Sequence, residues 1–461
     1  MTRSFRIFLL FILISLCGVS VYAQKYGIYK KTLDNGLDVI VINNPAVPLV
    51  TVEIDVKNGA YTESPEYDGL SHLYEHMFFK ANSKIPNQEA YMERLRELGA
   101  IWNGTTSEER VNYFITAPVD SLKECVQFMY DAVTSPLFLK DELVKERPVV
   151  TGEYDRNEAN PYFHLNREVS KRVWWKYYSR KNVIGDRDVI LSTTPEKMKT
   201  IQHRYYIPNN SALLLAGDIT PEKGFDLAEK IFSKWKRGPN PFDEYKVPDH
   251  PPIPANEGVV VKKPVNAVTM QCVWQGPSVG KDPKSTYAAD VLSFILGQET
   301  SKFHKDLVES GLAYGVSFSY YTLNHTGPIT LFAQTSIDKF DACQKAVFDE
   351  LKKMTDPDYF TDEQLENAKT ILATNEQYSR ERASQFVHTV GFWWAVAGLD
   401  YYLNYIDNLK KVTREDIKNY LEKYVVDKPH VLGVLVSPDQ AEKVDLILNI
   451  KEGEIKDDTK N

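Results

Sequence analysis

The chain has 461 residues, with 55 lysines and arginines against 63 aspartates and glutamates, and a formal net charge of −8. This length is enough for two large domains with hydrophobic cores of their own. The acidic balance, without a basic patch, argues against nucleic acid as a partner. Three cysteines would remain after removal of a leader, so we expect buried free thiols at Cys125, Cys272 and Cys343 rather than a disulfide scaffold.

The first residues predict a secretory signal peptide. Arg3 and Arg6 precede an apolar run over residues 7–17, and Ala23 ends a motif that suits cleavage. Removal of the two arginines would leave a mature chain with a net charge of −10. Cys17 raises the alternative of a lipoprotein, but Leu16 before it is large for such a site. No later run is long enough for a span, so we expect an exported, periplasmic protein without stable membrane insertion after cleavage.

Strand patterns follow the predicted leader. Residues 33–36 (Leu-Asp-Asn-Gly) predict a hairpin turn, and residues 37–42 predict the strand after it. Apolar and polar residues alternate over residues 50–57, which predicts a strand with one buried face. Asp68 is expected to cap the helix that comes next.

Helices and strands continue in mixed order. Asn87 predicts the start of a helix that Gly99 closes. Four further elements are predicted: one strand with polar interruptions over residues 100–113, an amphipathic helix over residues 121–134, a longer helical region over residues 141–175, and a buried strand over residues 213–216.

The second half of the chain repeats the first. Residues 194–205 resemble residues 413–424 at an offset of 219, and residues 213–215 match residues 432–434 at the same offset. A repeat this long indicates a duplicated domain rather than a solenoid. We therefore expect an α+β fold of two homologous domains, each a mainly antiparallel sheet packed with helices, arranged as a clamshell.

A proline-rich segment separates the two repeats. Six prolines lie between Arg237 and Gly258, a density that excludes helix and central strand and predicts an extended linker. The predicted divisions are a signal peptide (residues 1–23), an N-terminal domain (24–237), the linker (238–257), a C-terminal homologous domain (258–451) and a polar tail (452–461).

The most informative stretch is His72-Leu73-Tyr74-Glu75-His76. Residues four apart lie on one face of a helix, so His72 and His76 can hold one metal ion together. Glu75 lies on the same side, where a carboxylate can deprotonate a metal-bound water. This is the chemistry of the H-x-x-E-H zinc peptidases. The expected helix over residues 285–298 in the second repeat contains no histidine, so we expect one metal site per chain.

A catalytic zinc site needs a third protein ligand and an open position for water. Glu146 and Glu153 are candidates, because their spacing of seven residues equals two helical turns. Pro148 lies between them and would loosen the alignment if it broke the helix. Spacing alone leaves open that both are solvated helix charges. The remaining histidines are interpreted as structural or surface residues: His164, His203, His250, His304, His325, His388 and His430.

The motif and its flanks resemble the pitrilysin and mitochondrial-processing-peptidase family of zinc peptidases. Gly69-Leu70-Ser71 precedes the motif and Met77-Phe78-Phe79-Lys80 follows it, and glutamates stand 70 and 77 residues beyond His76. The resemblance implies that His72, His76 and Glu153 bind Zn²⁺. It further implies that Glu75 is the general base, that Glu146 orients a ligand or the water, and that Asn103 pairs with the substrate backbone.

One feature of the family pattern is missing. The resemblance implies a substrate-binding Arg seven residues before a Tyr in the second domain. Tyr314 matches the Tyr, but Leu307 occupies the Arg position and Lys305 is displaced from it. Some bacterial relatives divide these roles between a zinc subunit and an Arg/Tyr subunit. The hypothesis is that this chain works with a homologous partner subunit of that kind, or as a homodimer.

The leading interpretation is an exported zinc metalloendopeptidase that cuts peptides or unfolded segments in an enclosed chamber. One alternative is a non-catalytic scaffold or assembly subunit of the same family, although such subunits typically lose the motif. Another is a zinc hydrolase that acts on something other than peptides. Zinc content and a peptide-library digest separate the three.

Overall fold

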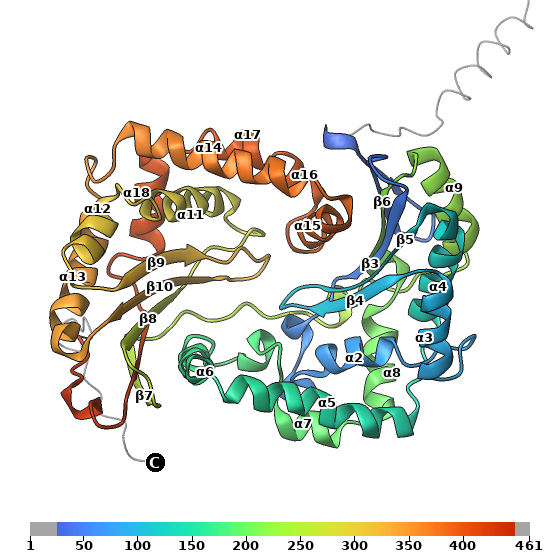
Figure 1. Cartoon of the computed structure of the whole chain (residues 1–461), viewed down its shortest axis with the longest axis horizontal. Coiled ribbons are helices and arrows are strands. Elements are labelled where there is room, and N and C mark those ends of the chain that lie inside the picture. The colour runs from blue at the N-terminus through green and yellow to red at the C-terminus, as the bar shows by residue number, and fades with distance from the viewer. Residues whose placement is uncertain (1–24, 448–461) are drawn as a thin grey trace, which may run out of the picture.

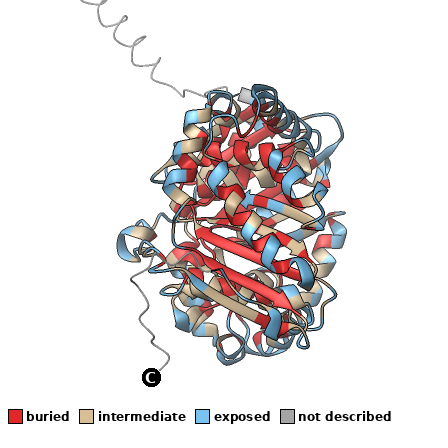
Figure 2. Ribbon diagram, turned by 90° about the vertical axis from the view of Figure 1, so that its left-hand side faces the viewer, coloured by how far each residue is buried: buried red, intermediate tan, exposed pale blue. Residues whose placement is uncertain are grey.

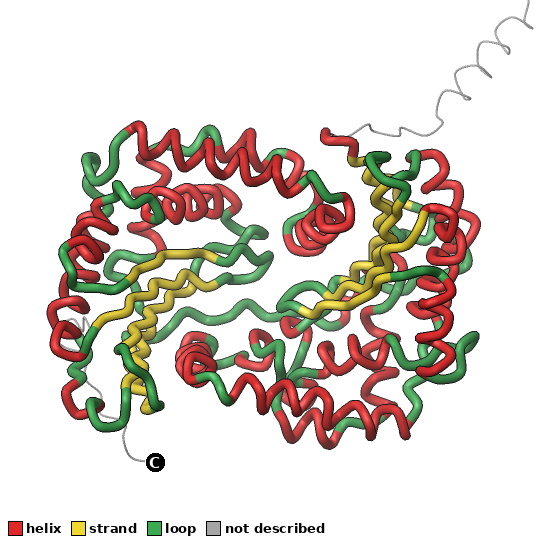
Figure 3. The backbone as a smooth tube through the Cα atoms, in the orientation of Figure 1, coloured by secondary structure: helices red, strands yellow, loops and turns green. Residues whose placement is uncertain are grey.

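The computed structural model describes residues 25–447 and contains two β-sheets packed with helices (Figures 1 and 3). The first sheet has the strand order β1-β2-β6-β3-β5-β4, and the second has the order β7-β11-β8-β10-β9. The strands are β1 (Ile28–Thr32), β2 (Asp38–Asn43), β3 (Leu49–Val56), β4 (Ile101–Thr106), β5 (Val111–Pro118), β6 (Ser211–Gly217), β7 (Glu257–Lys262), β8 (Val268–Gln275), β9 (Gly315–Tyr320), β10 (Pro328–Thr335) and β11 (Val431–Val436).

The two sheets have the same topology once β1 is set aside. Strands β2 to β6 and strands β7 to β11 occupy corresponding places when each set is taken in chain order. Each sheet also has one parallel pair, β2 with β6 and β7 with β11, among antiparallel neighbours. The predicted α+β fold of two homologous, mainly antiparallel domains is therefore confirmed.

Helices of the first half cover one face of the first sheet, and their apolar residues form its core with Val52, Ile54 and Tyr113. The helices of this half are α2 (Leu70–Phe78), α3 (Gln88–Glu97), α4 (Leu122–Thr134), α5 (Lys140–Glu158), α6 (Pro161–Val173), α7 (Arg187–Ser192), α8 (Pro195–Tyr205), α9 (Pro221–Phe232) and α10 (Pro241–Glu244), and all except α6 contact this core.

The second sheet is covered in the same way, with Met270, Leu331 and Val434 in its core. Figure 2 views the molecule from the side of this half. The helices of this half are α11 (Pro283–Leu296), α12 (Lys302–His304), α13 (Phe340–Lys353), α14 (Asp362–Ser379), α15 (Ala383–Val396), α16 (Leu399–Leu403), α17 (Tyr405–Leu409) and α18 (Arg414–Tyr424). Helix α11 occupies the place that α2 has in the first half and contains no histidine, as predicted.

The two halves exchange one helix each. Val387, Val390 and Trp394 of α15, from the second half, pack on the outer face of the first sheet against β2 and β6. In return, Leu165, Val169 and Val173 of α6 pack on the second sheet against β8 and β11. Figure 1 shows both helices beside the sheet of the opposite half. Because burying each large apolar side chain stabilises by about 1.5–3 kcal/mol, the exchange joins the halves firmly.

This exchange overturns the prediction that β3 is half buried. Thr51, Glu53 and Asp55 are buried as fully as the apolar residues between them, because α15 covers the polar face. Glu53 accepts a hydrogen bond from Asn112 and contacts His388 Nδ1 of α15. Burial, and then the neighbouring Glu53, raises the pKa of Asp55 well above its ordinary value. The alternation in the sequence is real, but its polar side faces a helix instead of water.

Three other element predictions are corrected. Residues 100–113 form the hairpin of β4 and β5 rather than one strand, with the turn at Ser107 to Arg110. Residues 141–175 form two helices, because Asn160 caps α6 and Pro161 starts it. The proline-rich segment contains one helical turn, α10, in which Pro241 takes the first helical position.

Several local predictions are confirmed. The turn over residues 33–36 joins β1 to β2 with Gly36 at φ +90°. Asn87 accepts a hydrogen bond from the Ala90 N–H at the start of α3, and Gly99 ends that helix at φ +63°. Cys125, Cys272 and Cys343 are free and buried. The signal peptide and the residues of the polar tail lie outside the described residues, and the domain boundaries stay predictions.

Candidate metal centre

Helix α2 carries the motif, and its packing fixes which way the histidines face. Leu70, Leu73 and Met77 are fully buried against the first sheet, so the opposite side of the helix carries His72, Glu75 and His76. Gly69, at φ +89°, begins the helix and offers no side-chain cap.

The predicted cap at Asp68 is wrong, because Glu63 takes that role. The carboxylate of Glu63 accepts hydrogen bonds from the N–H groups of Gly69 (2.7 Å) and Ser71 (2.6 Å). An acceptor at a helix N-terminus satisfies amides that have no partner within the helix. Asp68 instead accepts a hydrogen bond from the side chain of Asn182.

Helix α5 brings the two predicted glutamates to the histidines. It runs without interruption through Pro148, so Glu146 and Glu153 stay two turns apart on one side. Glu153 Oε2 lies 3.5 Å from His72 Nε2, and Glu153 Oε1 lies 3.8 Å from His76 Nε2. One donor atom from each of these three residues lies within 4.8 Å of the others.

This donor set suits zinc. Two imidazole nitrogens and a carboxylate oxygen are a ligand set of catalytic zinc sites, with bonds of about 2.0–2.2 Å. Donors at such bond lengths stand roughly 3.3–3.5 Å apart around a tetrahedral ion, close to the 3.5 and 3.8 Å that separate the Glu153 oxygens from the two imidazoles. Burial, and then the neighbouring His76, lowers the pKa of His72 to about 4. The imidazole of His72 is therefore neutral near pH 7, the form that binds a metal.

Glu146 orients His76 from behind. Its Oε1 accepts a hydrogen bond from His76 Nδ1 at 2.9 Å, which leaves Nε2 of that ring free to face Glu153. Lys80 forms an ion pair with Glu146 Oε2 at 2.5 Å. Burial opposes ionisation of Glu146, but the hydrogen bonds from His76 and Lys80 outweigh it, and the pKa of Glu146 lies below its ordinary value.

Glu75 is held against β4. Its Oε2 accepts a hydrogen bond from the hydroxyl of Thr106 at 2.8 Å. Gly104 lies beside it, and a Cβ atom at that position would stand 2.8 Å from Glu75 Cγ. Burial raises the pKa of Glu75, although the hydrogen bond from Thr106 works in the opposite direction.

A cavity of about 480 Å³ contains the whole group. Among the described residues, its lining comes from residues 72–153 and includes Asn103 of β4. Since β4 is the edge strand of the first sheet, Asn103 stands where an added strand would pair. Phe79 and Trp102 contribute an apolar wall, with ring centroids 4.5 Å apart.

Tyr314 is not part of this cavity. It precedes β9 in the other half, and 63% of its surface is exposed. Leu307 occupies the position, seven residues before Tyr314, at which the resemblance implies a substrate-binding arginine. Its side chain is completely buried in the core of that half.

Sequence reasoning missed Thr106, Gly104 and Lys80. Lys80 stands four residues after His76, a helical spacing that signals a shared face. Gly104 and Thr106 are two residues apart in a strand, and this spacing puts both on the face toward Glu75. The turn between β4 and β5 had to be recognised before that face could be assigned.

Comparison with known proteins identifies the family. The family model described as "Insulinase (Peptidase family M16)" matches residues 38–186, and the model described as "Peptidase M16 inactive domain" matches residues 192–372. The chain belongs to peptidase family M16. The resemblance inferred from the motif is thereby confirmed, and the half matched by the inactive-domain model contains α11, which has no histidine.

Relatives and solved structures extend over most of the chain. The zinc protease PqqE of Helicobacter pylori is 26% identical and covers 91% of this chain and 97% of its own length. An uncharacterized zinc protease of Rickettsia felis is 25% identical over 81% of this chain and 89% of its own. The crystal structure of a protease from Helicobacter pylori has a TM-score of 0.78 at 22% identity, with 88% of this chain and 98% of that chain covered. That of the periplasmic protease PqqL from Escherichia coli has a TM-score of 0.75 at 16% identity, with 93% of this chain and 50% of that chain covered.

Within residues 25–447, no helix has the length and apolar character needed to cross a membrane.

Proposed function

We propose that this chain is a zinc metalloendopeptidase that hydrolyses peptides or unfolded polypeptide segments. The observation that carries the proposal is the convergence of His72 Nε2, His76 Nε2 and a Glu153 oxygen, with Glu75 beside them in the same cavity. Three protein donors and one adjacent carboxylate are what metal-assisted hydrolysis requires.

One zinc ion per chain would be held by His72, His76 and Glu153. When bound, zinc acts as a Lewis acid that acidifies water and polarises a peptide carbonyl. Glu75 takes the proton of the attacking water at Oε1, since Oε2 accepts from Thr106, and returns it to the leaving amine. The raised pKa of Glu75 suits a base that must also act as an acid. Glu146 keeps His76 in the ligating orientation.

The substrate would bind as an added strand along β4, with Asn103 contacting its backbone. Support comes from the position of β4 at the sheet edge and from the presence of Asn103 in the cavity. Figure 1 shows β4 of the first half and β9 of the second on the sides that face each other, which favours a chamber enclosed between the halves.

A homologous partner subunit would complete substrate binding by supplying an Arg/Tyr pair, and a homodimer is the alternative arrangement. The proposal rests on Leu307, whose burial leaves no cation at the expected position, and on the exposure of Tyr314. Export to the periplasm is proposed from the leader sequence, and the periplasmic protease PqqL among the structural neighbours supports it.

A non-catalytic assembly role is the second candidate, favoured by the match of the inactive-domain model to residues 192–372. It predicts a protein that folds and assembles without stoichiometric zinc and without cleaving peptides. The intact constellation of His72, Glu75, His76 and Glu153 argues for the first candidate.

The test is metal content and peptide cleavage of the purified mature chain, alone and mixed with a homologous sister protein. The proposal predicts one zinc per chain and cleavage of a peptide library that stops on chelation and returns with zinc. It also predicts a higher rate with the sister protein than without. Full activity of the chain alone would overturn the partner hypothesis but leave the peptidase assignment standing.

A further inference from the structure

The two halves also meet at the ends of two corresponding hairpins. The turn between β4 and β5 (residues 107–110) belongs to the first sheet, and the loop between β9 and β10 (residues 321–327) has the same place in the second. Figure 1 shows both hairpins directed toward the middle of the molecule. Strand β4 places Gly104 and Thr106 against Glu75, so a contact that fixes the end of this hairpin also fixes the surroundings of the proposed general base.

Glu109, in the turn of the first hairpin, has only 2% of its surface exposed. Its Oε2 accepts a hydrogen bond from the N–H of Asn324 at 2.6 Å, and its Oε1 accepts one from the N–H of His325 at 2.9 Å. The ring of His325 adds a third contact, with Nδ1 at 2.9 Å from the same Oε1. Hydrogen bonds to a carboxylate are stronger than those between neutral groups, and losing one inside the protein leaves a buried group unsatisfied. Glu109 therefore ties the first hairpin to the loop of the second.

Two cations reinforce this contact between the halves. Arg110 Nη1 donates a hydrogen bond to the carbonyl of His388 in α15 at 2.8 Å, and Nη2 donates one to Thr105 Oγ1 of β4 at 3.3 Å. Lys181 Nζ donates to the carbonyl of Thr326 in the β9–β10 loop at 2.6 Å. The β4–β5 turn is thus held both by the β9–β10 loop and by α15, which belong to the second half.

The path from this contact to the metal centre is short. Thr106 lies three residues before Glu109, pairs with Val111 across the hairpin, and donates to Glu75 Oε2 at 2.8 Å. Because strand pairing continues up to the turn, a displacement of the turn moves the last pair of the ladder with it. The turn contains no glycine, asparagine or proline that would fix its shape, so its conformation depends on contacts from outside the hairpin.

We propose that Glu109 is a positioning residue: by binding the β9–β10 loop of the second half, it fixes β4 so that Thr106 holds Glu75 in place. The second half, which supplies none of the three proposed zinc ligands, is then needed for the geometry of the base. This inference rests on the proposed peptidase function, whereas the link between Glu109 and β4 can be measured without any activity.

Hydrogen exchange of the full chain tests this link. Glu109→Gln keeps the size of the side chain but replaces one acceptor oxygen with an amide group, which cannot accept from an N–H. We expect exchange in residues 101–106 of β4 to become about tenfold faster or more, with residues 211–217 of β6 unchanged. If this variant fails to fold, His325→Ala, which removes only the ring contact, replaces it. Exchange of β4 at the wild-type rate would overturn the proposal.

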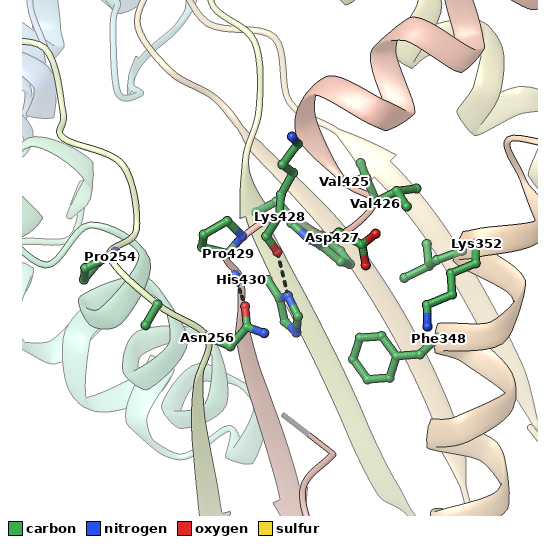
Figure 4. Close-up of a pocket in the computed structure, with 13 residues that line it drawn as sticks. Pro254, Asn256, Phe348, Lys352, Val425, Val426, Asp427, Lys428, Pro429 and His430 are labelled. Atoms are coloured by element: carbon green, nitrogen blue, oxygen red, sulfur yellow. Dashed lines mark hydrogen bonds between the residues drawn. The ribbon is translucent and has the colours of Figure 1, made fainter. Parts of the chain in front are cut away.

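Phe348→Leu is the control for a general loss of stability in the second half. Phe348 lines a cavity of about 470 Å³ there (Figure 4), and among the described residues the lining includes none from either hairpin. Loss of packing at this position should lower the melting temperature, while exchange in β4 and the kcat stay as in the wild type. Faster exchange of β4 in this control as well would overturn the specific role of Glu109.

A cycle of single and double variants tests whether Glu109 acts through Thr106. We expect Glu109→Gln to lower kcat for a fluorogenic peptide about fivefold to tenfold with one zinc per chain retained, but less than about twofold in the Thr106→Val background, where the link to Glu75 is already broken. Equal losses in both backgrounds would overturn the proposal. Absence of cleavage by the wild type would overturn the peptidase assignment and, with it, a role of Glu109 in the reaction, and the exchange result would then decide separately whether Glu109 holds β4.

Discussion

The substitution Gly104→Ala tests whether β4 fixes the general base. A Cβ atom at position 104 would stand 2.8 Å from Glu75 Cγ and 3.1 Å from Glu75 Oε1. Carbon atoms in contact prefer about 3.5–4.0 Å, so Glu75 must retreat by roughly 0.7 Å or more. Such a displacement of a reacting group costs about a hundredfold in rate, or about 2.7 kcal/mol of transition-state stabilisation.

The expected result is therefore a fall of about a hundredfold in kcat/KM for a fluorogenic peptide, with one zinc per chain retained. Zinc stays because its three proposed ligands are on α2 and α5, away from the added methyl group. Gly152→Ala is the matched control: it lies beside Glu153 on α5, and its Cβ would meet no atom within 4 Å. This control should keep activity and gain about 0.5–1 kcal/mol of stability from helix propensity. Activity of Gly104→Ala within twofold of the wild type would refute the reasoning.

Three further outcomes are expected. Thr106→Val removes the hydrogen bond to Glu75 and should lower kcat about tenfold with KM unchanged. Thr106→Ser keeps a hydroxyl and should have the wild-type kcat. An unchanged kcat in the valine variant would contradict the role of this hydroxyl. Burial raises the pKa of Asp68 from 3.8 to about 7, so its stabilising contribution is complete below pH ~4 and is lost as pH rises toward 7. Asparagine cannot ionise, so between pH 5 and 8 the free energy of unfolding of Asp68→Asn, measured with urea, should fall by about 2–3 kcal/mol less than that of the wild type. The same pH dependence in both proteins would contradict this assignment. Gly391→Ala places a methyl group of α15 against the Asp55 carboxylate of β3. It should lower the free energy of unfolding by about 1–3 kcal/mol, measured by thermal unfolding, without loss of zinc. Wild-type stability of this variant would argue against close packing of α15 on β3.

The pair of histidines was predictable from the sequence because its geometry is local, whereas Glu146 and Glu153 were assigned through the family resemblance. His72, Glu75 and His76 share one face of a short helix, and the seven-residue spacing of Glu146 and Glu153 needs only a continuous α5. Pro148 was the uncertain point. Helix α5 continues through this proline, because the loss of one backbone hydrogen bond does not outweigh the packing of the buried residues on both sides, Leu143 and Val150 among them.

The burial of β3 was not predictable from local pattern. Glu53 and Asp55 alternate with apolar residues as they would on a solvated face, but α15 covers them from more than 300 residues away. The sequence of α15 does not indicate which of the two sheets this helix covers, since an apolar helix face could pack on the sheet of either half. The exchange of α6 and α15 is therefore a property of the tertiary structure.

The hairpin of β4 and β5 was missed for a different reason. Its turn, Ser107-Glu108-Glu109-Arg110, lacks the glycine, asparagine or proline that usually marks a tight turn. Here the turn is held by the two residues after Gly59: the N–H of Ala60 donates to the carbonyl of Ser107 (3.4 Å), and the N–H of Tyr61 donates to the carbonyl of Glu108 (2.9 Å). Gly59 allows this approach because a Cβ atom there would stand 2.3 Å from the Ser107 carbonyl oxygen. Because β4 carries Gly104 and Thr106, missing the turn also hid the contacts of Glu75.

The variant Glu75→Gln tests the central claim most directly. Glutamine keeps the size of the side chain and its hydrogen bond to Thr106, and it leaves His72, His76 and Glu153 untouched, but it cannot take a proton. Zinc content and cleavage of a peptide substrate should be measured on the same preparation. The account predicts one zinc per chain with cleavage reduced at least a thousandfold. Cleavage by Glu75→Gln at a rate near that of the wild type would contradict it.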